Sequence, residues 1–281
     1  MLEFHVDESL CTHCKECARD CPSRVIALSD DGIPSLTPEA EQNCIRCQHC
    51  LAICPTGAIS ILGKQPGDSL VLDPSALPTL DAMEQLVCGR RTTRRYKPEN
   101  VSPETIQRLL DATAHAPTGA NRRALTFAVI DDRDEMKSIR QRVMEALQSA
   151  IEAGSVPEEL AYLHAAVPAF FKYRADLVFR GAPHLLLVSA GPDALCPNED
   201  VVIALSTFEM LATAAGLGTT WCGMLQMVLE SVPELKSLFD LPDDHTYYAM
   251  LFGIPKVKYA RATQRKGSAT IQRLTAGDKK P

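Results

Sequence analysis

The chain has 281 residues, 46% of them hydrophobic and 23% charged, with a formal net charge of −6. This composition is ordinary for a globular protein and allows one large and one small domain. The longest apolar runs are far shorter than the roughly 18 residues that cross a bilayer, which argues against a membrane protein. An acidic excess near the N-terminus argues against a nucleic-acid partner. The N-terminus lacks the basic and apolar segments of a secretory signal, so we expect a cytoplasmic location.

Eight of the eleven cysteines lie in a motif that occurs twice near the N-terminus. The pattern CxxCxxCxxxCP occupies residues 11–22 and recurs at residues 44–55. In a reducing cytosol, cysteines at such spacing favour metal binding over disulfides. A zinc site closes with four ligands in two CxxC pairs, so a third cysteine in each motif would have no role there.

The doubled motif is typical of iron–sulfur ligation, in which three cysteines of one motif and the last cysteine of the other hold one cube. We therefore assign one [4Fe–4S] cluster to Cys11, Cys14, Cys17 and Cys54, and a second cluster to Cys44, Cys47, Cys50 and Cys21. Over residues 1–62 the chain resembles the bacterial two-cluster ferredoxins.

Residues 63–79 are rich in Pro, Gly and Ser and are predicted to link the N-terminal module, 1–62, to a larger domain, 80–281. In that domain helical and strand patterns alternate. One helix is predicted to begin near Asp81 and a second at Ser102 and Pro103. A long helix is predicted to follow residues 125–131 and to end near Ala153. An apolar helix is predicted over 201–218, where Gly216 and Gly218 would end it. Strands are predicted at 125–131, 184–190, 219–223 and 246–253. The pattern indicates an α+β fold with a sheet of about four strands.

Two stretches of the larger domain contain residues that are suited to binding a ligand. In GRRTTRRYKP, residues 89–98, guanidinium groups and hydroxyls are close together, as a phosphate dianion requires. The alternative interpretation of this stretch is a solvated basic face or a patch that binds nucleic acid. In HAPTGANRRAL, residues 115–125, Gly119 allows close backbone approach to a ligand, and the Asn121 amide offers the donor and acceptor that a heterocycle edge requires.

Taken together, RRTTRRY, PTGAN and the later GLGTTWCG resemble the motifs of the FMN-dependent nitroreductase family, over about residues 80–266. The resemblance implies a mostly antiparallel sheet flanked by helices, in an intertwined homodimer with two FMN molecules at the subunit interface.

The resemblance also implies a set of FMN-binding residues. The phosphate and ribityl chain would be held by Arg90, Arg91, Thr92 and Arg94, and the isoalloxazine edge by Asn121. The backbone at Trp221, Cys222 and Gly223 would lie near the reactive side of the flavin. Arg265, followed by Lys266, matches a late basic residue that returns to the phosphate.

The chain departs from the family pattern after Asn121, where Arg122, Arg123, Ala124 and Leu125 replace Arg-Gln-Pro-Trp. Arg123 would favour an anionic flavin or an acidic substrate group, or it would face solvent. Segment 155–182 is a candidate lid over the substrate, with helix packing as the alternative role of its aromatic residues. Tyr162 and His164 are candidate proton donors.

These features predict an iron–sulfur flavoprotein oxidoreductase that passes electrons from the clusters to FMN and then to a nitroaromatic, quinone or activated alkene. No GxGxxG motif follows a predicted strand, so no Rossmann site for NAD(P)H is indicated. The family can dock the nicotinamide directly on the flavin, so the expected external donor is a ferredoxin, NAD(P)H or both. The alternative is an electron-transfer subunit that relays electrons through FMN to a docked protein.

Overall fold

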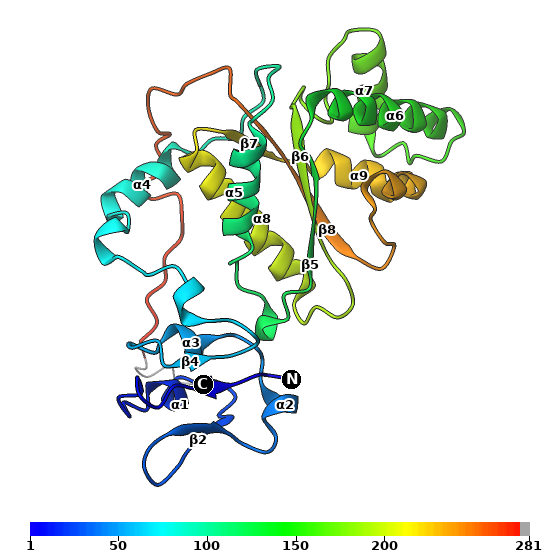
Figure 1. Ribbon diagram of the computed structural model, residues 1–281. Coiled ribbons are helices and arrows are strands. Elements are labelled where there is room, and N and C mark those ends of the chain that lie inside the picture. The colour runs from blue at the N-terminus through cyan, green and yellow to red at the C-terminus, as the bar shows by residue number, and fades with distance from the viewer. Residues whose placement is uncertain (276–281) are drawn as a thin grey trace.

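The computed structural model describes residues 1–275 in two parts joined by an extended segment (Figure 1). The N-terminal module contains two antiparallel strand pairs. β1 (His5–Val6) pairs with β4 (Ile59–Ser60), and β2 (Ile26–Leu28) pairs with β3 (Pro34–Leu36). Its helices are short: α1 (Glu16–Arg19), α2 (Ala40–Asn43) and α3 (His49–Ala52). A small apolar core that includes Leu2, Ile59 and Ile61 holds these elements together.

The internal repeat of the sequence is also a repeat of backbone conformation. Lys15 precedes α1 with φ 64°, and Gln48 precedes α3 with φ 61°. Two residues earlier, His13 and Arg46 have φ of 54° and 55°. Non-glycine residues seldom adopt this left-handed conformation, so its recurrence at both motifs shows that the same tight turn is built twice.

The connecting residues 63–79 contain two 3-10 turns, η1 (Pro66–Asp68) and η2 (Pro74–Ala76). Their side chains are exposed apart from the half-buried Pro66. α4 (Leu80–Gly89) follows, with the Thr79 hydroxyl accepting from the Ala82 amide at 3.2 Å. Thr79 is therefore the N-cap. The helix begins before the predicted start near Asp81, because a threonine caps a helix as an acid does.

The larger part is built on a four-stranded antiparallel sheet in the order β5-β6-β8-β7, which confirms the predicted α+β class. The strands are β5 (Leu125–Ile130), β6 (His184–Ala190), β7 (Gly218–Trp221) and β8 (Thr246–Gly253). β6 is buried along its whole length because helices cover both faces of the sheet.

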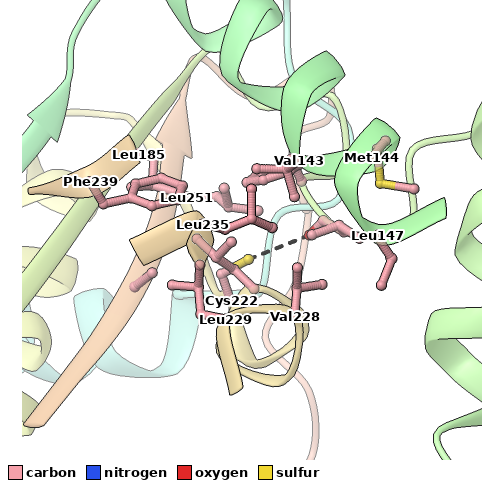
Figure 2. Close-up of a cluster of buried hydrophobic side chains, with 14 of the residues drawn as sticks. Val143, Met144, Leu147, Leu185, Cys222, Val228, Leu229, Leu235, Phe239 and Leu251 are labelled. Carbon is pink, nitrogen blue, oxygen red and sulfur yellow. Dashed lines mark hydrogen bonds between the residues drawn. The ribbon is translucent and has the colours of Figure 1, made fainter. Parts of the chain in front are cut away.

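One face of the sheet packs on α5 (Pro103–Thr113) and α8 (Pro197–Ala214). The other face is covered by α6 (Arg133–Glu152), α7 (Ala161–Phe171), α9 (Gly223–Ser231) and the 3-10 segment η4 (Pro233–Phe239). Figure 2 shows this second core, in which Leu185 of β6 and Leu251 of β8 meet Val143 and Leu147 of α6. Alternate residues of β6 therefore serve opposite cores.

α8 begins at Pro197 and ends at Ala214, four residues earlier at each end than the predicted 201–218. Proline is favoured in the first helical turn because its amide would have no partner there. Gly216, with φ +77°, ends the helix in the left-handed conformation. Gly218 instead begins β7, where a methyl group in place of its hydrogen would collide with the Thr93 side chain. Its role is close backbone packing and not helix termination.

Among residues 1–275, none of the helices combines the length and the apolar character needed to cross a lipid bilayer.

Candidate functional site

The eight motif cysteines line two separate cavities of the N-terminal module. Cys11, Cys14, Cys17 and Cys54 border the first cavity, and Cys21, Cys44, Cys47 and Cys50 border the second. Each cavity thus receives three cysteines from one motif and the last cysteine from the other. These are the two sets that the sequence predicts as cluster ligands.

The thiols differ in how readily they ionise. Burial raises the pKa of Cys17, and it raises the pKa of Cys50 to about 11, so a thiolate at Cys50 needs a cation beside it. Burial acts in the same direction at Cys54. There it is outweighed by hydrogen bonds from the Ala58 amide, at 3.2 Å, and from Thr56, so the pKa of Cys54 is lowered.

Within the described part of the chain, no three His, Cys, Asp or Glu side chains are grouped so as to hold a metal ion. A [4Fe–4S] cube has an iron at each of four corners, so its cysteines surround a cavity and do not converge on one point. The two cysteine-lined cavities have this arrangement.

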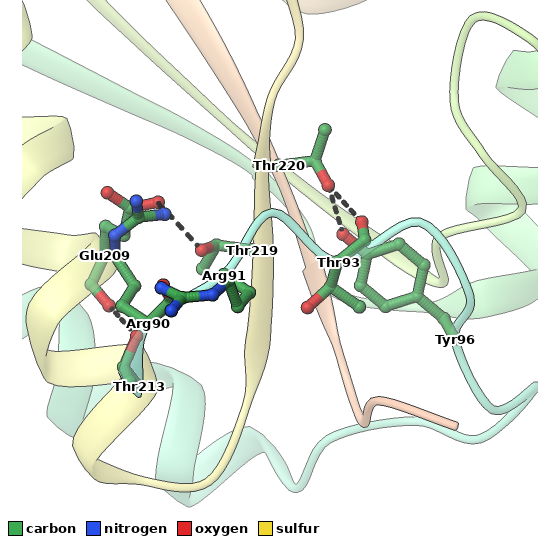
Figure 3. Close-up of polar contacts among 8 residues, drawn as sticks. All are labelled: Arg90, Arg91, Thr93, Tyr96, Glu209, Thr213, Thr219 and Thr220. Atoms are coloured by element: carbon green, nitrogen blue, oxygen red, sulfur yellow. Dashed lines mark hydrogen bonds and ion pairs between the residues drawn. The ribbon is translucent and has the colours of Figure 1, made fainter. Parts of the chain in front are cut away.

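The arginine stretch runs along the outer side of β7 (Figure 3). Thr92 pairs with Thr219 in a parallel bridge, and the Thr93 amide donates to the Thr219 carbonyl at 2.8 Å. The Thr220 hydroxyl donates to the Thr93 carbonyl and lies 2.9 Å from the Tyr96 hydroxyl. The backbone of this stretch is therefore fixed to the sheet at Thr92 and Thr93.

Arg90 and Arg91 have different surroundings. Arg90 forms an ion pair of 3.1 Å with Glu209 of α8, whose carboxylate also accepts from the Thr219 hydroxyl at 3.1 Å. Arg91 donates from one terminal nitrogen to the Arg90 carbonyl. Within residues 1–275, its Nε and its other terminal nitrogen are buried without a hydrogen-bond partner. An unpaired buried guanidinium is costly, so Arg91 fits an anionic ligand such as a phosphate.

The remaining basic residues of the predicted phosphate site are more open. Arg94 and Arg95 are exposed. Arg265 lies in the exposed tail after β8, in a turn closed by the Ser268 amide donating to its carbonyl at 3.1 Å. Their predicted roles toward a phosphate stay predictions.

Residues 118–123 form a tight loop before β5 that includes the 3-10 turn η3 (Gly119–Asn121). The Gly119 amide donates to Asp200 at 2.9 Å, and the Arg123 amide donates to the Thr118 hydroxyl at 3.0 Å. The Asn121 side chain donates to the carbonyl of Ile45, at 2.9 Å, across the boundary between the two parts of the chain. The Arg123 guanidinium donates to the Ala114 carbonyl at 3.0 Å, which gives it a local structural partner.

The end of β7 turns sharply into α9. Trp221 packs on Tyr248 with ring centroids 5.6 Å apart, and a side chain at Gly223 would meet the Tyr248 hydroxyl. The Cys222 side chain faces the other core, where burial raises the pKa of its thiol to about 12. The Cys222 sulfur is therefore an inert packing group, and the backbone role of this residue near the flavin stays a prediction.

A cavity of about 330 Å³ lies near this bend, lined by residues of α8, α9 and the start of β8, including Gln226, His245, Tyr247 and Tyr248. Within the described residues, the Tyr247 hydroxyl is buried without a hydrogen-bond partner. Burial raises the pKa of Tyr247 to about 12, so its hydroxyl keeps its proton at neutral pH. The sequence patterns did not single out this tyrosine.

Segment 155–182 is tied into the fold more closely than the predicted lid role suggests. Phe179 is fully buried, and Asp176 forms an ion pair of 2.9 Å with Arg140 of α6. Tyr162 is 75% exposed, and the His164 ring lies 3.2 Å from the Pro157 carbonyl. In Figure 1, α7 lies beside α6, away from η3. Helix packing, the alternative for this segment, accounts for its buried residues, and the proton-donor roles of Tyr162 and His164 stay predictions.

Sequence reasoning missed the two buried acids of α8. Asp200 and Glu209 are 2% and 7% exposed, and they anchor the Asn121 loop and Arg90 respectively. A signal was present for Glu209, because it is the one charged residue in the apolar segment 201–218 and a buried carboxylate needs partners.

Comparison with known proteins agrees with both parts of the chain. Residues 87–254 match the Nitroreductase family, and residues 10–59 match a 4Fe-4S dicluster domain. Nitroreductase NfnB of Mycolicibacterium smegmatis is 25% identical over 193 residues, which cover 55% of this chain and 77% of that protein.

Two solved structures have a similar fold. A nitroreductase with bound FMN from Bacteroides fragilis aligns with a TM-score of 0.55 and 18% identity over 68% of this chain and 98% of its own. A second nitroreductase with bound FMN, from Desulfitobacterium hafniense, aligns with a TM-score of 0.53 and 21% identity over 68% and 97%. Because the family match covers more than half of its length, the chain belongs to the nitroreductase family, as an oxidoreductase with an N-terminal 4Fe-4S ferredoxin domain.

Proposed function

We propose that the protein carries two [4Fe–4S] clusters and FMN, and that it reduces a small electrophilic acceptor with electrons passed from the clusters. The observation that carries this proposal is the contact between Asn121 and Ile45, because it joins a cysteine motif to the loop that resembles the flavin-binding PTGAN motif. Iron–sulfur clusters exchange single electrons, and FMN accepts them singly and delivers two to one acceptor.

The cysteine-lined cavities support the ligand sets proposed for the clusters. Each cavity offers four sulfurs from two motifs, and Cys17 and Cys50 close the inner walls. Amide hydrogen bonds to Cys44, from Arg46 at 3.4 Å, and to Cys54, from Ala58 at 3.2 Å, would stabilise the thiolates.

The unpaired donors of Arg91 support FMN as the anionic ligand, and the two FMN-bound neighbours of the same fold point to the same cofactor. Arg91 and Arg94 would neutralise the phosphate, joined by Arg265 from the tail, and the Thr92 hydroxyl would donate a hydrogen bond to it. Arg90 would position the stretch through Glu209. Asn121 still offers its side-chain carbonyl oxygen and one N–H to the ring edge, because only one of its two amide hydrogens is used by Ile45.

A second copy of this chain is the proposed partner. Three apolar residues of α4, Leu80, Met83 and Val87, are exposed, as are Val202 and Ile203 of α8. An exposed apolar face on adjoining helices indicates a protein interface. A homodimer would cover it and would complete the walls of a flavin site beside α8.

The cavity beside Trp221 is the proposed acceptor site. Its lining, which includes Tyr247 and Tyr248, suits a planar nitroaromatic compound, quinone or activated alkene. The external donor is either a ferredoxin or NAD(P)H. The boundaries 1–62, 63–79 and 80–281 and the cytoplasmic location stay predictions.

Anaerobic purification followed by iron, sulfide and FMN analysis tests the cofactor content directly. We expect about eight irons and one FMN per chain, and flavin bleaching when a low-potential donor reduces the clusters. Turnover of small acceptors separates an enzyme from a relay subunit. Clusters without FMN would contradict the proposed arginine and asparagine roles, and bleaching without any acceptor turnover would favour the relay to a docked protein.

A further inference from the structure

The loop of residues 118–123 is held in a conformation that its sequence does not favour. Ala120 and Asn121 have φ of 47° and 54°, in the left-handed region. Such residues persist only where the surrounding structure fixes them. Here the buried Asp200 holds the Gly119 amide at 2.9 Å, and the Thr118 carbonyl accepts from the Asn121 amide at 2.9 Å. The Asn121 side chain therefore projects from a rigid support.

That side chain reaches the second cysteine motif. Its amide nitrogen donates to the Ile45 carbonyl, and Ile45 lies between Cys44 and Cys47. Figure 1 shows the short η3 turn lying against the N-terminal module. The loop that would meet the flavin edge thus touches the backbone of one particular cluster-binding turn.

The internal repeat provides a comparison within the molecule. Thr12, Cys14 and Lys15 of the first motif are exposed. Their counterparts 33 positions later, Ile45, Cys47 and Gln48, are half-buried. The backbone conformations of the two turns match, and Cys14 and Cys47 are the same residue type, so the difference in burial between these two cysteines reflects what lies next to each turn.

We infer that the two clusters have fixed and different places in the electron path. The cluster held by Cys44, Cys47, Cys50 and Cys21 lies next to the flavin, and the cluster held by Cys11, Cys14, Cys17 and Cys54 lies at the solvent side and receives electrons from the external donor. Asn121 is the positioning residue that keeps the inner turn at the flavin domain. This inference rests on the proposed function.

The electron balance of the path is simple. A one-electron donor of the ferredoxin class reduces the outer cluster, which passes the electron to the inner cluster and is reoxidised. Two such passages, with one proton from water, convert the bound oxidised flavin to its two-electron reduced anion. The acceptor would then take both electrons together with that hydrogen, as a hydride, which returns the flavin to the oxidised form.

Matched cysteine variants of the full-length protein test the order. Cys14→Ala and Cys47→Ala occupy equivalent positions of the two motifs, and iron analysis with EPR identifies the cluster left in each. Flavin bleaching is followed after mixing with reduced ferredoxin, and the double variant measures reduction that bypasses the clusters.

We expect Cys47→Ala to reduce its flavin no faster than the double variant, although its outer cluster is reduced. Cys14→Ala should still reduce its flavin faster than the double variant, because the inner cluster remains. The opposite result, or equal rates in the two single variants, would overturn the inference.

A second experiment does not depend on flavin or on the cysteine variants. A soluble paramagnetic relaxation agent should broaden the EPR signal of one reduced cluster in the wild-type protein more than that of the other. Asn121→Asp removes the donor to Ile45 and should make the protected signal accessible as well. Asn43→Asp, on the exposed face of α2 beside Cys44, adds the same charge and should not.

Equal broadening of the two wild-type signals, or the same response in both variants, would overturn the inference. If the two clusters differ in accessibility but the protein binds no FMN, the proposed function fails. The turn around Ile45 would still be shown to be the one that the larger domain covers. The two failures are therefore distinguishable.

Discussion

Glu209 and Arg90 form an ion pair of 3.1 Å between the C-terminal half of α8 and the stretch beside β7. Their side chains are 10% and 25% exposed, and the same carboxylate accepts from Thr219. The Glu209 carboxylate thus connects α8, β7 and the arginine stretch at the proposed phosphate site.

Glu209→Ala should destabilise the protein by about 3 kcal/mol, because it leaves the Arg90 charge without its partner in a poorly hydrated place. The measurement is denaturant unfolding followed by the fluorescence of Trp221, the single tryptophan of the chain. Glu230→Ala, on the exposed side of α9, is the control and should change stability by less than about 0.5 kcal/mol. An equal loss in both variants would show that the Arg90 pair contributes nothing specific.

Arg91→Met should weaken FMN binding by about tenfold or more, because a hydrogen bond to a charged group contributes about 1.5–3 kcal/mol. The stability of the flavin-free protein should not fall, since two nitrogens of Arg91 are buried without partners in the described structure. FMN titration followed by flavin fluorescence measures the first effect. The exposed Arg95→Met is the matched control, and an equal effect on affinity would favour a diffuse basic face over a defined phosphate site.

Gly218→Ala should cost about 1–3 kcal/mol, because the added methyl group meets the Thr93 side chain in a fully packed place. Combination with Thr93→Gly, which removes the colliding atoms, should cost less than the sum of the two single changes. Gly67→Ala is the control, since a methyl group there has nothing within 4 Å. Strict additivity of Gly218→Ala and Thr93→Gly would contradict the close approach.

His184 should make stability depend on pH. Burial lowers the pKa of this histidine from 6.5, and its Nε2 accepts from the Val101 amide at 2.9 Å, which requires the neutral ring. Below about pH 6.5 the unfolded chain binds a proton that the folded protein resists, so the free energy of unfolding falls as pH falls. His184→Gln, which keeps an acceptor but does not titrate, should flatten this dependence between pH 7.5 and 5.5. An unchanged slope would place the proton uptake elsewhere.

Cys54→Ala should remove the cluster of the first motif, although Cys54 belongs to the second. Iron should fall from about eight to about four per chain, and the remaining EPR spectrum should match that of Cys14→Ala. Cys21→Ala should give the spectrum of Cys47→Ala instead. The reverse pairing of spectra would show that each motif closes its own cluster.

The elements that depend on local pattern were predictable. The run HLLLVSA fixed β6 at His184–Ala190, and Ser102 with Pro103 gave the start of α5, because strand burial and helix capping are properties of neighbouring residues. The contacts that build the site were not. Asn121 meets Ile45, 76 positions earlier, only because the two parts of the chain dock, and no periodicity records that.

The arrangement of the cysteines was predictable only in part. The spacing indicated which cysteines share a cavity, since a duplicated motif constrains the pairing. It did not indicate which turn faces the larger domain, because the two motifs have the same cysteine spacing.

Segment 63–79 joins the two parts in one molecule and so determines how often they meet. A hydrogen bond such as that from Asn121 to Ile45 contributes about 1 kcal/mol, so the docking of the two parts also rests on the packing that half-buries Ile45, Cys47 and Gln48. A contact of this small size would dissociate between two separate proteins at cellular concentrations. Because the two parts share one chain, their encounter is intramolecular and has an effective concentration of about millimolar order. The docked arrangement therefore does not depend on how much protein the cell contains, whereas a separate carrier would deliver its electrons only as often as collisions allow.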